Sequence, residues 1–154
     1  MYIHISVTTA ARRNETTMPC ACANLRRAAR SITRLYNREL RPEKIEATQF
    51  TLLMALDRTG DISQGKLGRL VGLDSTTLTR MLKPLNQHGW IQEREGDDRR
   101  VRIIRLTTAG RAKLQHGLPH WKRAQARIED ALGEPSMKKL EALLARVEAA
   151  SKNK

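Results

Sequence analysis

Residues 72–106 constrain the fold of this 154-residue chain more than any other segment. The segment begins with a Thr-rich, basic stretch in which apolar residues recur at helical spacing, and this stretch ends at a Gly-Trp pair. Two short apolar runs follow, at residues 91–94 and 101–106, and the turn between them has the sequence Gly-Asp-Asp-Arg-Arg. The pattern predicts a helix followed by a two-stranded hairpin with arginines at its tip.

A second, shorter helix is expected directly before the basic one. Ser63 is placed to cap its start, and Gly72 supplies the tight turn that follows it. Asp74 then caps the basic helix, which is expected to reach residue 88 and to be broken or kinked at Pro84. Two helices joined by a short turn and followed by a hairpin form a winged helix-turn-helix. The predicted fold class is therefore mainly α with a small β-wing.

Helices are also expected on both sides of this unit. Residues 22–40 carry one apolar and one Arg-rich face at helical spacing, and Thr48 is the expected N-cap of the helix after them. A long helix begins at Thr107 or Thr108, and Pro135 opens a last helix whose apolar residues recur at i, i+3, i+4 and i+7. Such a stripe needs a partner helix. A chain of this size with helices at both ends often completes its core by dimerising.

These elements divide the chain into four predicted parts. A flexible N-terminal arm covers residues 1–19, unless translation starts at Met18, and a dimerisation helix covers residues 20–44. The winged helix-turn-helix covers residues 45–110, and the C-terminal dimerisation helices cover residues 111–154.

The charge of the chain favours a polyanionic partner. Lys and Arg number 29 against 16 Asp and Glu, giving a net charge of +13, which suits nucleic acid or an anionic membrane surface. The basic residues are spread along the chain, so charge alone does not locate a site. No run of about 18 apolar residues occurs, and no membrane-spanning segment is predicted. Two cysteines and no apolar signal segment indicate free thiols in the reducing cytoplasm.

The basic helix and the hairpin supply the residues expected to contact DNA. In a winged helix-turn-helix the second helix enters the major groove, where hydroxyl side chains approach closely and an arginine can pair with guanine. Arginines at the wing tip enter a minor groove or neutralise phosphates, and an aspartate beside them is unfavourable unless it orients an arginine. The predicted DNA-binding residues are Ser75, Thr76, Thr77, Arg80 and Lys83 on the helix, and Asp98, Arg99 and Arg100 on the wing.

Five short motifs in this region follow a known pattern. They are Thr48-Gln49-Phe50-x-Leu52-Leu53, Leu78-Thr79-Arg80, Gly89-Trp90-Ile91, Asp98-x-Arg100 and Leu106-Thr107-x-x-Gly110. Together they resemble the multiple antibiotic resistance regulator (MarR) family over about residues 20–150. The resemblance implies an obligate homodimer with entwined terminal helices, bound to a pseudo-palindromic double-stranded DNA operator. It also implies that Arg100 is the minor-groove residue and Asp98 its orienting partner.

The resemblance also suggests how such a protein is controlled. Family members are usually repressors released by small lipophilic or aromatic acids, in a crevice for which Tyr36, Met54 and Trp121 are the candidate lining residues. Some members sense oxidants through a cysteine near the first helix. Here Cys20 and Cys22 lie at the start of that helix, where the positive helix end favours a thiolate. They are either a redox switch or two inert small residues.

The sequence does not indicate a metal site, a cofactor or an enzyme. A Cys-x-Cys pair offers at most two of the four ligands of a structural zinc site, and the phosphate-loop, dinucleotide, zincin and serine-elbow motifs are absent. The few aromatic residues do not interleave with a basic face, as an RNA platform requires. The alternative to a regulated repressor is an effector-independent architectural protein that binds double-stranded DNA without strong sequence preference.

Overall fold

The computed structural model describes residues 19–152 of the chain. It divides into two units, Met1–Ile32 and Thr33–Lys154. Helix α1 (Ala21–Leu40) starts in the first unit and ends in the second. Residues 1–18, which hold nearly all of the expected N-terminal arm and Met18, lie outside the described residues.

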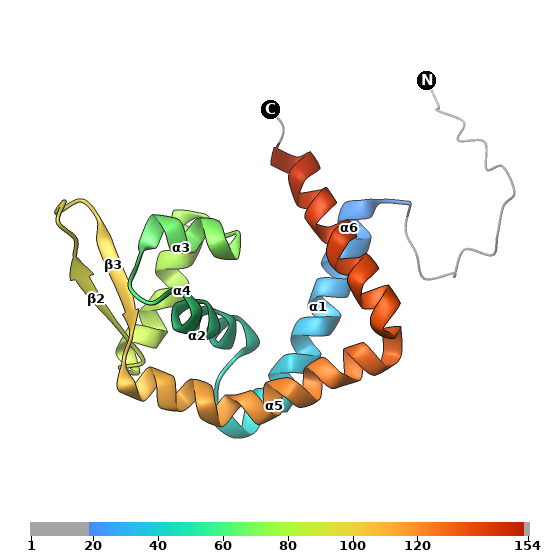
Figure 1. Ribbon diagram of the computed structural model, residues 1–154, viewed down its shortest axis with the longest axis horizontal. Coiled ribbons are helices and arrows are strands. Elements are labelled where there is room, and N and C mark those ends of the chain that lie inside the picture. The colour runs from blue at the N-terminus through green and yellow to red at the C-terminus, as the bar shows by residue number, and fades with distance from the viewer. Residues whose placement is uncertain (1–18, 153–154) are drawn as a thin grey trace, which may run out of the picture. The chain divides into compact units, whose positions relative to one another are not determined.

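The second unit contains a winged helix-turn-helix followed by two helices (Figure 1). Its three strands form one antiparallel sheet in the order β1-β3-β2, and a short turn joins α3 to α4. This architecture confirms the predicted mainly helical fold with a small β-wing. After α1 the elements are η1 (Arg41–Glu43), α2 (Ala47–Thr59), β1 (Ile62–Ser63), α3 (Gln64–Val71), α4 (Ser75–Gln87), β2 (Ile91–Glu95), β3 (Arg102–Leu106), α5 (Thr108–Leu132) and α6 (Glu134–Lys152).

Short polar side chains begin the helices of this unit where the sequence predicts. The Ser63 hydroxyl accepts a hydrogen bond from the Lys66 N–H (3.3 Å) at the start of α3. Gly72 ends α3 in the left-handed region, with φ +68°, a conformation that favours glycine. Thr107 caps α5, where its hydroxyl accepts from the Gly110 N–H (3.0 Å). Each cap is a local contact that fixes the start of its helix.

Strand β3 lies at the centre of the sheet, and its sequence departs from clean alternation at one residue. Ile104 pairs with Ile62 of β1 on one side and Glu93 of β2 on the other, and its side chain is fully buried. Ile103 is half-buried, whereas Arg105 is exposed. Ile104 and Leu106 therefore face the core and Arg105 faces solvent, and the half-buried Ile103 is the apolar residue on the outward face that disturbs the alternation.

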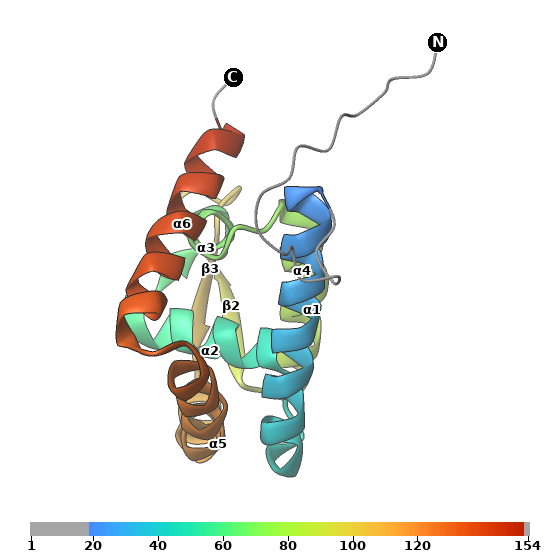
Figure 2. The same ribbon diagram turned by 90° about the vertical axis from the view of Figure 1, so that its right-hand side faces the viewer.

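The core lies beneath the helix-turn-helix and the base of the wing. Its fully buried side chains come mainly from α2 and α4, and α2 packs against α5 (Figures 1 and 2). Burial of each leucine contributes about 1.5–3 kcal/mol, so the inner face of α4 is firmly held. The fully buried large side chains are Leu40, Phe50, Leu52, Leu53, Leu56, Leu67, Leu78, Leu82, Leu85 and Ile104.

The predicted start of α2 was wrong. The helix begins at Ala47 with Glu46 as its N-cap, and Thr48 lies inside the first turn. The Gln49 side chain accepts a hydrogen bond from the Glu46 N–H (3.0 Å), and Asn37 of α1 accepts one from the Ala47 N–H (2.7 Å). The contact with Asn37 is tertiary, so the sequence around Thr48 gave no sign of it.

The predicted break at Pro84 was also wrong, because α4 is one helix with Pro84 inside it. A proline removes the hydrogen bond to the carbonyl four residues earlier, here that of Arg80. Arg80 is on the exposed face, where water can bond that carbonyl. The flanking Leu82 and Leu85 are fully buried, and their packing holds the last turn in helical geometry.

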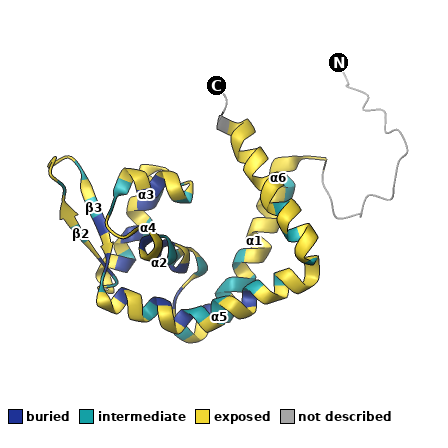
Figure 3. Cartoon of the chain, viewed as in Figure 1, coloured by how far each residue is buried: buried dark blue, intermediate teal, exposed yellow. Residues whose placement is uncertain are grey.

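Helix α6 is exposed along most of its length (Figure 3). Its stripe of apolar side chains remains open to solvent, with Leu143 44%, Leu144 41% and Val147 43% exposed. No helix within residues 19–152 combines the length and apolar character needed to cross a membrane.

Candidate nucleic-acid interface

Helix α4 presents a polar, basic face to solvent. Ser75, Thr76, Arg80 and Lys83 are exposed, while the opposite face is buried in the core. Thr77 is half-buried. The arrangement leaves hydroxyl groups at the start of the helix and two cations further along it, as a major-groove helix requires.

Asp74 organises the start of this helix. Its carboxylate accepts hydrogen bonds from the Thr77 N–H (2.8 Å) and from the Thr77 hydroxyl (2.6 Å). The hydrogen bond from the Thr77 hydroxyl, followed by that from the Thr77 N–H, lowers the pKa of Asp74 below its ordinary value. The Thr77 proton is thus used inside the protein, so this hydroxyl can only accept a hydrogen bond from DNA. Thr77 supports the helix start, whereas Ser75 and Thr76 face outward.

The wing tip is a tight turn held by backbone hydrogen bonds. The Gly96 N–H donates to the Val101 carbonyl (2.7 Å), and the Val101 N–H donates to the Asp98 carbonyl (2.8 Å). The Asp98 side chain accepts from the Arg100 N–H (2.9 Å), so it orients the Arg100 backbone within the turn. The expected charge-assisted pair between Asp98 and an arginine side chain does not occur among the described ion pairs. Arg99 and Arg100 are both exposed at the tip.

Other charges of the wing are paired along its length. Arg94 of β2 contacts Asp61, and Arg102 of β3 contacts Glu93, each at 3.2 Å. Both arginines are at least half exposed, so each pair contributes about 0–1 kcal/mol to stability. These pairs neutralise charges along the body of the wing, and at its tip Asp97 and Asp98 offset the charges of Arg99 and Arg100.

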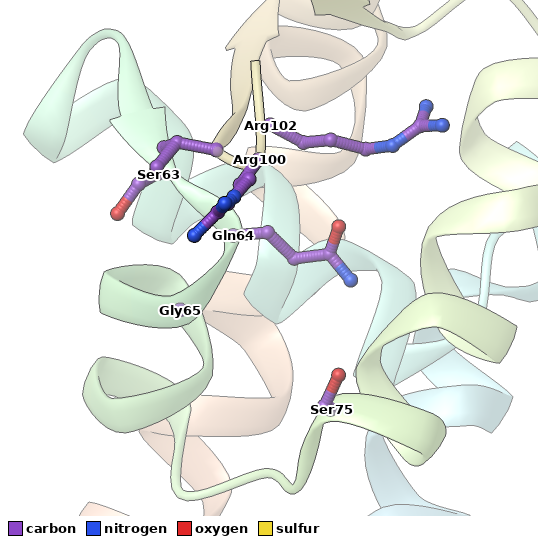
Figure 4. A pocket seen from close by; sticks show the side chains of 7 residues that line it. Ser63, Gln64, Gly65, Ser75, Arg100 and Arg102 are labelled. Atoms are coloured by element: carbon purple, nitrogen blue, oxygen red, sulfur yellow. The ribbon is translucent and has the colours of Figure 1, made fainter. Parts of the chain in front are cut away.

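The start of α3, the start of α4 and the wing surround one open hollow of about 450 Å³ (Figure 4). Two of the predicted residues, Ser75 and Arg100, line this hollow together. The sequence did not predict the other residues of the lining. Capping by Ser63 indicated where α3 begins, but no local pattern indicated that this helix start faces Arg100. The additional lining residues are Ser63, Gln64, Gly65, Val101 and Arg102.

The base of the wing is locked to the start of α5. The Thr107 N–H donates to the Trp90 carbonyl (3.0 Å), and the Thr107 hydroxyl donates to the Gly89 carbonyl (2.6 Å). A Cβ at Gly110 would lie 1.9 Å from the Trp90 carbonyl oxygen, so only glycine allows this approach. Lys113 lies over the Trp90 ring, 5.4 Å from its centroid. The Leu-Thr-x-x-Gly motif is thus a close-packing motif that joins wing and helix.

The candidate effector residues lie on three different helices. Met54 lines an open hollow of about 520 Å³ between α2 and α3, together with Arg58 and Leu70. The Tyr36 hydroxyl of α1 donates to the Gln125 side chain of α5. Burial, with a smaller effect of the Glu129 charge, raises the pKa of Tyr36 above its ordinary value. Trp121 of α5, the third candidate, is half-buried and packs against the core.

The two cysteines lie at the N-terminal end of α1. Cys20 precedes the helix and Cys22 is its second residue, and both are free and exposed. Their position at the positive end of the helix matches the sequence-based expectation.

Comparison with known proteins identifies the family. The MarR family model matches residues 45–101. Among solved structures, the Mycobacterium tuberculosis transcriptional regulator MosR in complex with DNA is 34% identical. Its alignment covers 87% of this chain and 99% of MosR, with a TM-score of 0.78. A mutant Escherichia coli MarR bound to operator DNA is 26% identical over 82% of this chain and 91% of MarR, with a TM-score of 0.74.

Curated relatives give the same result over a shorter span. The multiple antibiotic resistance protein MarR of Salmonella typhimurium is 38% identical over 80 residues, which cover 51% of this chain and 56% of the relative. The HTH-type transcriptional regulator SarZ of Staphylococcus haemolyticus is 36% identical over 90 residues, or 58% of this chain and 61% of SarZ. Each alignment thus spans less than two thirds of the curated relative. From its fold, its wing motifs and these relatives together, the chain belongs to the MarR family.

Proposed function

We propose that this chain is a transcriptional regulator that binds a double-stranded DNA operator with α4 and the wing. The observation that carries the proposal is the shared hollow, where Ser75 of α4 and Arg100 of the wing face one space. A helix start in the major groove and an arginine in the adjacent minor groove need this relative placement. The DNA complexes of MosR and of MarR support the same use of the fold.

The test is binding to duplexes that the purified protein selects from a random-sequence library. Arg100→Ala is expected to weaken binding to the selected duplex by about 1–3 kcal/mol at fixed salt. Arg69→Ala is the matched control, because Arg69 is an exposed arginine on α3 that lies outside the lining of the hollow, the wing and the helices proposed to form the dimer. Equal affinity of Arg100→Ala and wild type would contradict the wing assignment. A wild-type ratio of specific to non-specific affinity near one would favour the architectural alternative.

We further infer that the regulator is a homodimer and that its operator is pseudo-palindromic. The exposed stripe of Leu143, Leu144 and Val147 on α6 supports this, because an apolar stripe at helical spacing is stabilised by a second helix. In this proposal residues 20–44 and 111–154 hold the dimer together, and residues 45–110 bind DNA. A two-fold dimer binds two half-sites related by the same symmetry.

We also propose that a small molecule or an oxidant controls DNA binding. The hollow beside Met54 combines an apolar lining with the cation of Arg58, which suits a small lipophilic or aromatic acid. The exposure of Cys20 and Cys22 supports oxidation by peroxide, in which a thiolate attacks one peroxide oxygen and becomes a sulfenic acid while hydroxide leaves.

The two modes of control are separated by one set of binding measurements. Peroxide is expected to release the selected duplex from wild type and not from the double variant Cys20→Ser/Cys22→Ser. Release of both proteins by peroxide, or of neither, would reject the cysteine switch. An aromatic carboxylate, such as benzoate, is expected to release both proteins equally, and Arg58→Ala should abolish that release.

A further inference from the structure

We propose that Gln64 is a positioning residue for operator recognition, which sets the angle of α4 by tying the start of α3 to it. This inference rests on the proposed function. The Gln64 Nε2 atom donates a hydrogen bond to the Thr79 hydroxyl (2.8 Å), and that hydroxyl donates to the Ser75 carbonyl (2.8 Å). Figure 4 shows the Gln64 side chain extending from the start of α3 toward α4.

The chemistry of Thr79 fixes the direction of these hydrogen bonds. A hydroxyl has one proton, and here it is shared with the Ser75 carbonyl. If the Gln64 amide were flipped, its oxygen would face the Thr79 hydroxyl. That hydroxyl would then lie between two acceptors, the Gln64 oxygen and the Ser75 carbonyl, with one proton for both. Gln64 must therefore donate. A carboxylate at position 64 can only accept, so with glutamate the Thr79 proton would have to leave the Ser75 carbonyl.

Two contacts are needed to hold one helix at a fixed angle to another. At one end, the Leu73 N–H donates to the Gly68 carbonyl (2.9 Å), and a Cβ at Gly68 would lie 3.4 Å from Leu78 of α4. This contact and the buried Leu78, Leu82 and Leu85 hold the inner face of α4 in the core, but they do not tie its exposed face to α3. The bond between Gln64 and Thr79 joins the helices at the other end of α3 and adds this tie on the exposed side of α4.

A fixed helix angle matters more for base recognition than for general attraction to DNA. Phosphates are attracted by charge, which tolerates small rotations of the helix. Hydrogen bonds to base edges tolerate them poorly, because their strength falls steeply with angle and distance. Loss of the tie is therefore expected to lower specific affinity while non-specific affinity stays the same.

The test compares four variants, Gln64→Met, Thr79→Val, the double variant Gln64→Met/Thr79→Val, and Thr79→Ser. Each is measured at fixed salt on the duplex selected by wild type and on a scrambled duplex of equal length. Each single variant is expected to lose about fivefold in the ratio of specific to non-specific affinity, the equivalent of one neutral hydrogen bond. The double variant should lose no more than either single variant, and Thr79→Ser, which keeps the hydroxyl, should retain the wild-type ratio.

Four outcomes would overturn the proposal. They are an unchanged ratio in Gln64→Met, a multiplicative loss in the double variant, a loss in Gln64→Met without one in Thr79→Val, and a loss in Thr79→Ser. The third would mean that Gln64 contacts DNA itself. A fall in thermal stability with an unchanged ratio would show a purely structural role. If the wild-type protein selected no preferred duplex, that result would instead reject the proposed function, and this inference with it.

Discussion

Gly110 is the glycine at which the structure predicts the largest loss of stability from one added methyl group. In Gly110→Ala the new Cβ would lie 1.9 Å from the Trp90 carbonyl oxygen and 2.7 Å from the Leu106 Cδ1 atom. Leu106 can turn aside, but the Trp90 backbone is held by hydrogen bonds to Leu85 (2.9 Å) and Thr107 (3.0 Å). The clash can be relieved only if α5 moves away from the base of the wing.

The size of the effect follows from that movement. Real Cβ contacts are essentially never shorter than 3.0 Å, so a clash of 1.9 Å requires a shift of roughly 1 Å. Overpacking costs about 1–3 kcal/mol, and the upper end applies because the obstacle is backbone. Alanine is better than glycine inside a helix by about 1 kcal/mol, which offsets part of the cost. The net expectation is a loss of about 2 kcal/mol in the free energy of unfolding, or about 4–8 °C in melting temperature.

The assay is thermal unfolding followed by circular dichroism at one fixed protein concentration, since a dimer melts in a concentration-dependent way. Gly65→Ala is the matched control, because Gly65 also lies near the start of a helix but its Cβ would meet only Arg69, at 3.9 Å. That control is expected to melt at or slightly above the wild-type temperature. A Gly110→Ala protein as stable as wild type would refute the close-packing account of the Leu-Thr-x-x-Gly motif.

Three further predictions use the same measurements or simple extensions of them. Gly117→Ala should lower the free energy of unfolding by about 1–3 kcal/mol, because its Cβ would lie 2.5 Å from the fully buried Phe50 ring; an unchanged melting temperature would contradict this. Asp74 has a lowered pKa, so it stabilises the fold above about pH 4, the unfolded value, and this stability is lost as the pH falls through the folded pKa. Wild type should therefore exceed Asp74→Asn in stability at neutral pH, and the difference should shrink in acid; a constant difference from pH 7 into acid would argue against it. Leu143→Asp should sediment as a monomer, since it puts a charge into the exposed apolar stripe of α6, and a dimer of wild-type size would count against that stripe as the interface.

The features that could be predicted from the sequence are those that local chemistry determines. Ser63 and Asp74 cap helices because a short polar side chain bonds the N–H three residues later, whatever the rest of the chain does. Gly72 ends α3 because its left-handed backbone favours glycine. The exposed face of α4 follows from the spacing of its buried leucines. These local rules were sufficient to predict the helix-turn-helix and the wing.

The features that were missed depend on contacts between distant residues. Strand β1 has only two residues, and it exists because Ile62 and Ser63 pair with Ile104 and Ile103 of β3. A two-residue strand has no detectable periodicity. Likewise, Gln64 and Thr79 are 15 residues apart, and nothing in either local pattern indicates that their side chains meet. The hollow that joins α3, α4 and the wing could therefore not be predicted as one site.

Helix α5 is the physical connection between the wing and the helices proposed to form the dimer. Its first turn packs against the Trp90 backbone at Gly110, where there is no room for an added methyl group. Three turns or more further on, Arg123 and Arg127 both pair with Glu39 of α1, at 3.4 and 3.2 Å. Because a helix transmits displacement along its axis with little compression, a movement that carries α5 along its axis would also displace the base of the wing. In the proposed regulator, a signal that moves α5 in this way would reach the wing without contact with the surface proposed to bind DNA.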